Sequence, residues 1–136
     1  MAITHVPVPG WDEPTAAQRL ELLDRTRSIA IVGVSTNPAR PSNFVATYLM
    51  GSSADYELFF VNPSLTEIFG QPCYPSLEAL PKTPDMVDVF RKSEDLPVVA
   101  NEVVAIGASS LWIQLGLWSV EAAQIALQSG IEVVMD

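Results

Sequence analysis

Basic residues, cysteine and histidine are scarce in this sequence. Seven Lys and Arg residues stand against sixteen Asp and Glu residues, which gives a formal net charge of −9 at pH 7. This balance opposes binding to duplex nucleic acid and to anionic membrane surfaces. The single cysteine, Cys73, has no second cysteine with which to form an internal disulfide, and the single histidine is His5. We therefore expect neither a disulfide-stabilised fold nor a nucleophile activated by a neighbouring histidine.

Long apolar runs are also missing. No stretch reaches the roughly 18 apolar residues that a membrane span needs, and the first residues do not form a basic segment followed by an apolar one, so we expect a cytoplasmic protein. The 136 residues, 49% of them hydrophobic, are enough for one sizeable core. Pro7, Pro9, Gly10 and Pro14 predict an extended arm at the surface over residues 1–14, followed by a single domain over residues 15–136.

Strands and helices alternate in the rest of the pattern. Thr15 and Gln18 fit a capping box for a helix that ends near Arg27, and Ser93 is the expected cap of a later helix. The predicted strands span residues 29–34, 56–61, 86–90, 110–115 and 131–135, and the other predicted helices span residues 44–51, 93–107 and 119–129. The proline-rich residues 64–84 leave room for a short strand near Cys73 and one helical turn around residues 77–80. This order predicts an α/β fold with a mostly parallel five-stranded sheet and helices on both faces.

The first predicted strand runs into a loop of small and polar residues that is followed by a helix. Gly33 lets the backbone approach a ligand closely. Ser35, Thr36 and Asn37 carry side chains that can donate to phosphate oxygens, and the helix that starts near Ser42 points its free N–H groups at the same spot. The junction predicts a site for a nucleotide or another phosphorylated ligand.

The pattern of a dinucleotide site is missing. Such a site has G-x-G-x-x-G at the first turn and an acidic residue about 20 positions later, where the second strand ends. Gly33 stands alone here, Asp55 precedes the second strand, and that strand ends in Asn62-Pro63. No Gly-Lys-Ser or Gly-Lys-Thr triplet is present, so the sequence also lacks a Walker loop. Neither of these common nucleotide motifs explains the loop.

Three of the seven basic residues, Arg40, Arg91 and Lys92, are expected on the ligand side of the sheet. Their concentration in an acidic protein favours a ligand with more phosphate charge than NAD. Two of them also have plainer interpretations, because Arg91 could pair with Glu94 or Asp95 at the surface and Lys92 could simply be solvated.

Several ordered motifs strengthen the phosphate-ligand hypothesis. They are IVGVS at 31–35, RPS at 40–42, VATYL at 45–49, VNP at 61–63, YPSL at 74–77, DVFR at 88–91, WIQLG at 112–116 and VVMD at 133–136. With them the sequence resembles, over about residues 28–136, the small CoA-binding proteins. These share a Rossmann-like, doubly wound fold with the CoA-binding domain of the succinyl-CoA synthetase alpha subunit. Similar family members continue with an Arg-Cys pair and an acidic tail, whereas the sequence ends at Asp136, so that cysteine receives no role.

The resemblance implies coenzyme A or an acyl-CoA as the ligand, bound without catalysis, because the phosphohistidine of the similar synthetase subunit belongs to a separate domain. It also implies a role for each matching position. Gly33, Val34, Ser35, Thr36 and Asn37 would line the CoA diphosphate, Arg40 and Ser42 would hold phosphate, Asn62 and Pro63 would lie near the adenosine, Val89, Phe90 and Arg91 would border the nucleotide, and Gln114, Leu115 and Gly116 would form a wall toward the pantetheine arm.

Two other functions remain open at this stage. One is an NAD(P)-linked Rossmann oxidoreductase, since the basic residues tolerate the extra phosphate of NADP. The other is a protein-interaction module with a vestigial loop, in which apolar residues near Leu115, Leu117 and Trp118 form a contact patch for a partner enzyme or a homodimer. The aromatic residues Phe90, Trp112 and Tyr48 are expected in the core rather than against an adenine ring, and Gln114 is expected either at the ligand or bonded to a neighbouring loop.

Overall fold

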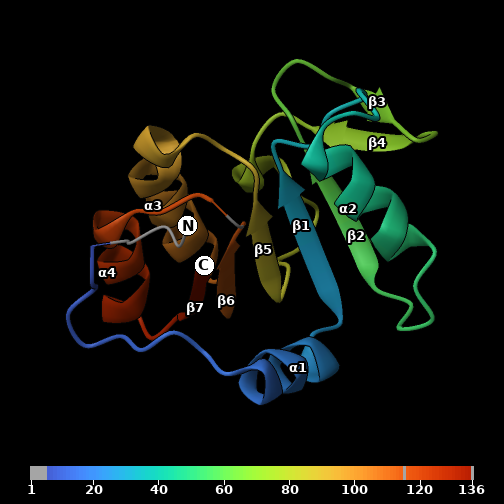
Figure 1. Cartoon of the computed structure of the whole chain (residues 1–136). Helices are drawn as coiled ribbons and strands as arrows, with labels where there is room; N and C mark the ends of the chain where they lie inside the picture. Colours follow the sequence, from blue (N-terminus) through green and yellow to red (C-terminus); the bar gives the residue numbers. More distant parts are fainter. Residues whose placement is uncertain (1–5, 115, 136) are drawn as a thin grey trace.

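A single sheet of seven strands forms the centre of the computed structural model, which describes residues 6–114 and 116–135 (Figure 1). The strand order across the sheet is β3-β4-β2-β1-β5-β6-β7, and every pairing is parallel except that of β3 with β4. The strands are β1 (Ser28–Val32), β2 (Glu57–Val61), β3 (Glu67–Ile68), β4 (Gln71–Tyr74), β5 (Met86–Val89), β6 (Ser110–Ile113) and β7 (Glu132–Met135).

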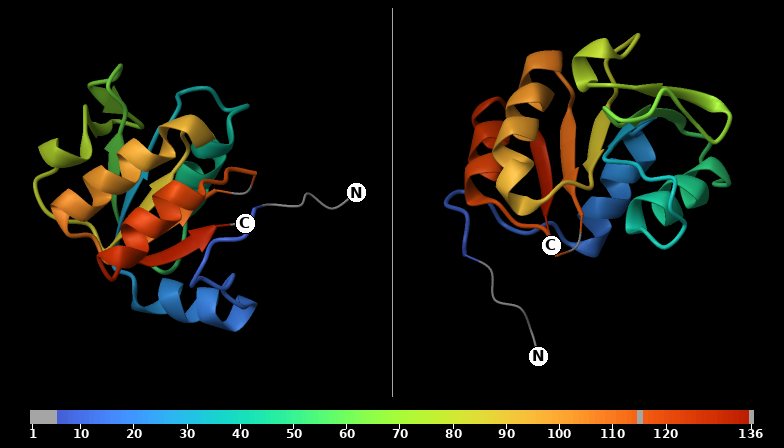
Figure 2. Two further views of the ribbon diagram at one scale, coloured as in Figure 1. Left: turned by 90° about the vertical axis from the view of Figure 1, so that its left-hand side faces the viewer. Right: turned by 90° about the horizontal axis from the view of Figure 1, so that it is seen from above.

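Helices cover both faces of the sheet. The helices are α1 (Ala16–Arg25), α2 (Pro41–Met50), α3 (Leu96–Ile106) and α4 (Val120–Gln128), with short 3-10 turns η1 (Leu77–Ala79) and η2 (Ser93–Asp95). Figure 2, in the view from above, shows α3 and α4 on one side of the sheet and α1 and α2 on the other. Among the described residues no helix is both long and apolar enough to cross a membrane.

The sheet has seven strands where the sequence predicted five. The additional pair, β3 and β4, is a short hairpin whose turn contains Phe69 and Gly70 with positive φ angles of 56° and 72°. Strand β4 then pairs in parallel with β2, placing Cys73 beside Phe60. The short strand allowed near Cys73 is β4, but β3 has only two residues and shows no alternation, and the pairing of β4 depends on the open edge of β2 rather than on a local signal.

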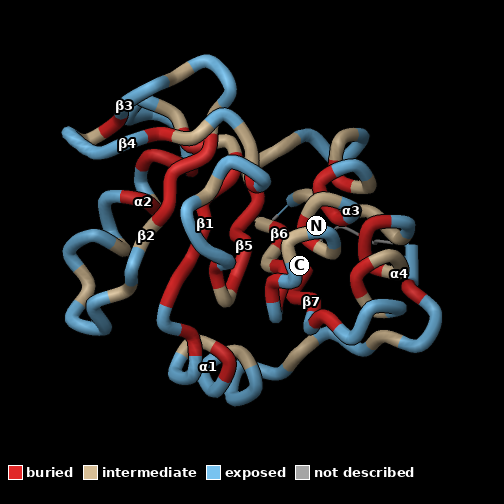
Figure 3. Tube along the Cα trace, turned by 180° about the vertical axis from the view of Figure 1, so that it is seen from behind, coloured by how far each residue is buried: buried red, intermediate tan, exposed pale blue. Residues whose placement is uncertain are grey.

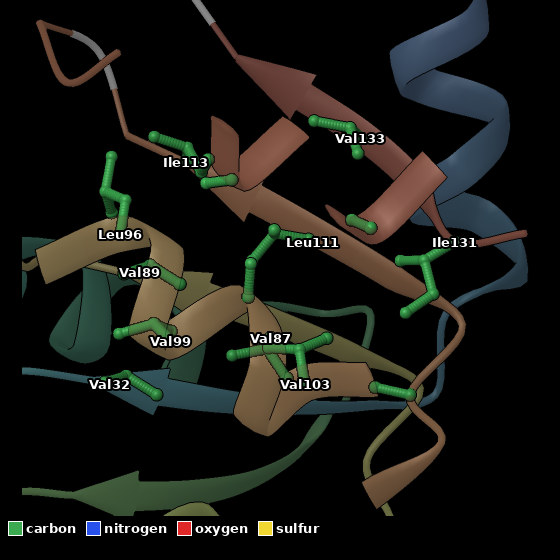
Figure 4. Packing of buried hydrophobic residues seen from close by; sticks show 14 of the residues in the cluster. Val32, Val87, Val89, Leu96, Val99, Val103, Leu111, Ile113, Ile131 and Val133 are labelled. Carbon is green, nitrogen blue, oxygen red and sulfur yellow. The ribbon is translucent and has the colours of Figure 1, made fainter. Parts of the chain in front are cut away.

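Two apolar clusters hold the layers together, one on each face of the sheet. The central strands are buried along their length while the loops at their ends are exposed (Figure 3). On the face covered by α3, Val87 and Val89 of β5 pack against Val99 and Val103 of the helix (Figure 4). Full burial of one such side chain contributes about 1.5–3 kcal/mol, so these contacts fix the strands on which the loops are mounted.

The described part of the N-terminal segment, residues 6–14, packs along the sheet edge with most of its residues exposed. Val8 is buried, and Trp11 donates from Nε1 to the Val133 carbonyl oxygen of the edge strand β7 at 2.9 Å. The rings of Trp11 and Trp118 meet edge to face with centroids 5.8 Å apart, and Trp118 Nε1 donates to the Val6 carbonyl at 2.8 Å. Trp118 belongs to the contact patch of the alternative interaction-module hypothesis, and in the structure it is half-buried and in contact with segment 6–14.

Two further placements differ from the sequence-based prediction. The capping box of Thr15 and Gln18 is present, but α3 begins only at Leu96, and Ser93 opens η2 and accepts a hydrogen bond from the backbone N–H of Trp118. Tyr48, expected in the core, is 69% exposed on the outer face of α2. Residues on α2 alternate between an inner and an outer face every three to four positions, and Ala46 occupies the inner one.

Candidate functional site

The carboxyl ends of β1 and β5 form the point at which the strand order reverses. From β1 the chain crosses by α2 to β2 on one side, and from β5 it crosses by α3 to β6 on the other. The loops that leave two such neighbouring strands diverge, and the crevice between them is where open α/β sheets bind ligands. The loops here begin at Gly33, after β1, and at Phe90, after β5.

Gly33 is the residue at which these two loops touch. Its φ angle is +87°, and its N–H donates to the Val61 carbonyl oxygen at 2.9 Å. A Cβ atom at this position would lie 2.5 Å from the carbonyl oxygen of Phe90, closer than real Cβ atoms come. Glycine is therefore required by both the backbone conformation and the close approach of the β5 loop.

The polar side chains of the loop bind the loop's own backbone. Ser42 Oγ accepts from the Ser35 N–H at 3.0 Å, and Ser35 Oγ accepts from the Asn37 N–H at 3.1 Å. Asn37 Oδ1 accepts from the Ala39 N–H at 2.9 Å, and Asn43 Nδ2 donates to the Ser35 carbonyl at 2.8 Å. The hydroxyl and amide groups predicted to donate to phosphate thus also shape the loop that precedes α2.

Asn62 has a similar internal role. Its Nδ2 donates to the Val34 carbonyl and its Oδ1 accepts from the Ser64 N–H, both at 2.8 Å. The amide that the sequence analysis placed near an adenosine therefore ties the end of β2 to the loop after β1, and both of its polar atoms are engaged. Pro63, the next residue, is exposed beside it.

A pocket of about 500 Å³ opens at this crevice. It contains all three basic residues predicted on the ligand side, in a protein that has only seven. Arg40 and Lys92 form no ion pair with any other described residue, and the N-terminal end of α2 adds its partial positive charge. The lining residues are Gly33, Ser35, Arg40, Pro41, Ser42, Phe90, Arg91, Lys92, Gln114 and Leu117.

A second pocket, of about 260 Å³, shares Arg91 with the first. Its lining includes Pro63, Ser76 and Val98, so it lies between the ends of β2 and β4 and helix α3. Arg91 Nη2 lies 3.6 Å from the Asp95 carboxylate, an ion pair in which both side chains are about 40% exposed. The predicted surface ion pair of Arg91 is therefore present, while its predicted contact with a ligand stays a prediction, although Arg91 lines both pockets.

Six other predicted site residues do not line either pocket. The side chains of Val34 and Val89 are fully buried in the core, so only their backbones could reach a ligand. The remaining four are Thr36, Asn37, Asn62 and Gly116. Leu115, predicted in the wall toward the pantetheine arm, lies outside the described residues.

Asp88 is a feature of the site that the sequence analysis did not assign. It lies on β5 with 5% of its surface exposed, and its carboxylate accepts a hydrogen bond of 2.5 Å from Gln114 Nε2. Burial raises the pKa of this carboxyl to about 7, although the hydrogen bond from Gln114 lowers it. The available signal was an acidic residue within the apolar run Met86–Phe90.

Other parts of the molecule are less suited to an anionic ligand. A pocket of about 370 Å³ between segment 6–14, α1 and β7 is lined by Asp12, Glu21 and Glu132, with Arg25 already paired to Glu132. Cys73 is buried, and this burial raises the pKa of its thiol. The basic pocket at the switch point is therefore the candidate site.

Comparison with known proteins identifies the family of the chain. The family described as a CoA binding domain matches residues 27–136, a range that includes every residue of the crevice. The uncharacterized protein YneT of Bacillus subtilis (strain 168) is 39% identical over 123 residues, which cover 90% of each chain. ADP-forming acetate–CoA ligase I of Archaeoglobus fulgidus is 24% identical over 125 residues, which cover 85% of this chain and 18% of the ligase.

The fold matches solved structures over nearly the same range. A hypothetical protein from Pyrococcus horikoshii OT3 superimposes with a TM-score of 0.83 at 32% identity, covering 98% of this chain and 90% of the other. The family resemblance found in the sequence motifs is thereby confirmed. The chain belongs to the family of CoA binding domains.

Proposed function

We propose that this protein binds coenzyme A or an acyl-CoA in the crevice at the switch point, as a binding protein rather than a catalyst. The observation that carries the proposal is the gathering of Arg40, Arg91 and Lys92 in one pocket of a protein with a net charge of −9. Without such a cluster the overall charge would repel a ligand that carries several phosphate charges. Membership in the CoA binding domain family supports the same ligand.

The diphosphate of the ligand would lie over the loop after β1. Gly33 allows close approach of the backbone, and the first turn of α2, with Ser42 buried in it, directs N–H groups and partial positive charge toward the pocket. Arg40 and Arg91 flank this position and have the fork of N–H donors that suits phosphate oxygens. One of them would meet the 3′-phosphate, which distinguishes CoA from NAD.

The two ends of the ligand would extend in opposite directions from this point. The smaller pocket beside Pro63 and Ser76 has room for the adenosine, and Arg91 borders it while paired with Asp95. The pantetheine arm would follow the other direction, along Gln114 and the half-buried Leu117. Thr36, Asn37 and Gly116 would take part through their backbones or at the rim.

The kinds of side chain that surround the crevice support binding without chemistry. The described residues that line its two pockets are apolar, hydroxyl, amide, carboxylate and basic groups, with no histidine or cysteine to serve as base or nucleophile. Ser35 and Ser42 hydroxyls are the nearest nucleophile types, and each accepts a hydrogen bond from the loop backbone. The protein would therefore hold or present the cofactor, with the acyl group left to a partner.

Isothermal titration calorimetry with CoA, dephospho-CoA, acetyl-CoA, NAD and NADP tests the proposal. We expect micromolar or tighter CoA binding, weakened by about 10-fold or more in Arg40→Ala and Arg91→Ala, as for the loss of a charged hydrogen bond. Arg25→Ala is the matched control, because Arg25 lies on α1 and pairs with Glu132 away from the crevice. Binding of NADP without CoA would replace the proposal with the oxidoreductase hypothesis, and no binding by any of the five ligands would reject it.

A further inference from the structure

The Gln114 amide joins the ligand pocket to a carboxyl group inside the sheet. Gln114 follows β6 and lines the larger pocket, while its Nε2 donates to Asp88 Oδ1 on the neighbouring strand β5. Asp88 itself lines no described pocket. The two residues therefore connect the pocket to the interior through one hydrogen bond.

Apolar residues surround the Asp88 carboxyl on the described elements packed against it. In the sheet register β1 places Ile31 beside it and β6 places Trp112 there, and α2 contributes Ala46 to the same apolar layer. Among the described residues, Gln114 is the one that hydrogen-bonds the Asp88 side chain. The charged side chains that line the neighbouring pocket are Arg40, Arg91 and Lys92. The shift of the Asp88 pKa has burial and the Gln114 bond as its causes, with no charged group among them.

An ionised carboxylate determines how the amide is turned. Because a carboxylate only accepts hydrogen bonds, Gln114 must direct its Nε2 toward Asp88 and its Oε1 away from it. No described residue donates to this Oε1. The amide therefore keeps its Oε1 available as an acceptor in a fixed orientation, whereas in a freely rotating glutamine Oε1 and Nε2 could exchange places.

We propose that Asp88 is a positioning residue that turns the Gln114 amide so that Oε1 accepts a hydrogen bond from an N–H group of the ligand. The inference rests on the proposed function and deepens it, since the pantetheine arm of CoA carries two amide N–H groups. A protonated Asp88 can donate to Oε1 and let the amide present N–H to the pocket instead. The protonation of one buried carboxyl thus decides which polar group the wall offers.

The first test uses the ligand-free protein and NMR. Between pH 5.5 and 8.5 we expect the Gln114 side-chain amide signals to shift with the same midpoint as the Asp88 carboxyl carbon. In Asp88→Asn this shift should disappear. Gln71 lies on β4, outside the pocket, and its amide signals serve as an internal control that should stay constant. Gln114 signals that do not follow Asp88 would overturn the inference, whatever the protein binds.

The second test measures the CoA dissociation constant at pH 6 and pH 8. If only the ionised form binds well and its pKa is about 7, affinity should be about 10-fold weaker at pH 6. Dephospho-CoA controls for the titration of the 3′-phosphate. Asp88→Asn and Gln114→Met should each remove this pH dependence, and the double variant should lose no more than either single one.

The outcomes separate the inference from the proposed function. If the wild type binds no CoA at pH 8, the proposed function fails, and the ligand assigned to Oε1 fails with it. If CoA binds with the same pH profile in the wild type and in Asp88→Asn, only the positioning role fails. An affinity that rises toward pH 6 would show that the Gln114 amide donates to an acceptor atom of the ligand, which would overturn the proposal.

Discussion

The Asp88→Asn variant should gain stability relative to the wild type as the pH rises from 5 to 8. The carboxyl of Asp88 is buried, and its pKa in the folded protein is about 7, against 3.8 for the unperturbed group. A folded-state pKa above the unfolded value means that the folded protein binds the proton more tightly. The stability contributed by this group is therefore complete below about pH 4 and is lost as the pH rises through 7.

The magnitude follows from the size of the shift. A difference of about 3 pKa units corresponds to about 4 kcal/mol of unfolding free energy between the two pH extremes. About 3 kcal/mol of it is lost between pH 5 and pH 8, where the protein can be studied without protonating most other carboxylates. Asparagine has nearly the same shape and does not titrate. Its Nδ2 adds a buried donor, which costs about 1–3 kcal/mol at every pH.

Urea unfolding followed by circular dichroism at pH 5, 6, 7 and 8 measures this difference. The unfolding free energy of Asp88→Asn minus that of the wild type should rise by about 3 kcal/mol from pH 5 to pH 8. Asp12→Asn, which changes an exposed carboxylate, should show no such rise. A constant difference between Asp88→Asn and the wild type would refute the reasoning, because Asp88 would then ionise in the folded state as readily as in the unfolded one.

The other predictions concern the loop and the N-terminal segment. Gly33→Ala should lower the free energy of unfolding by more than 1 kcal/mol and weaken CoA binding, measured by urea unfolding and calorimetry, because its Cβ meets a carbonyl oxygen. Gly107 has a similar φ angle but open space around the position of a Cβ atom. Gly107→Ala should therefore lower the free energy of unfolding by about 1 kcal/mol and leave CoA binding unchanged. Asn62→Ala removes two hydrogen bonds at the end of β2 and should cost about 1–3 kcal/mol in the same unfolding assay. Trp11→Phe keeps an aromatic side chain but loses the Nε1–H that bonds Val133, so limited proteolysis should cut segment 6–14 faster than in the wild type.

Local patterns predicted the elements that carry a strong signal of their own. The capping box at Thr15 and the apolar runs of β1, β2, β5, β6 and β7 required no knowledge of the fold, since periodicity and capping depend on neighbours in the chain. Elements whose partners are distant were missed or misplaced. The hairpin of β3 and β4 depends on the edge of β2, and Ser93 bonds Trp118, 25 residues away, instead of capping a helix.

The sequence by itself determined the fold class, the family and the basic residues that gather at the switch point. Glycine, hydroxyl and arginine residues at the ends of apolar runs predict a phosphate site because parallel strands bring their carboxyl ends to one edge. Only the tertiary structure decided what each side chain does there. The side chains of Asn62 and Ser35 form hydrogen bonds with the backbone of the loop after β1. Asp88 on β5 is bonded to Gln114, which follows β6. Hydrogen bonds between residues distant in the chain depend on the register of the strands, which no single segment specifies.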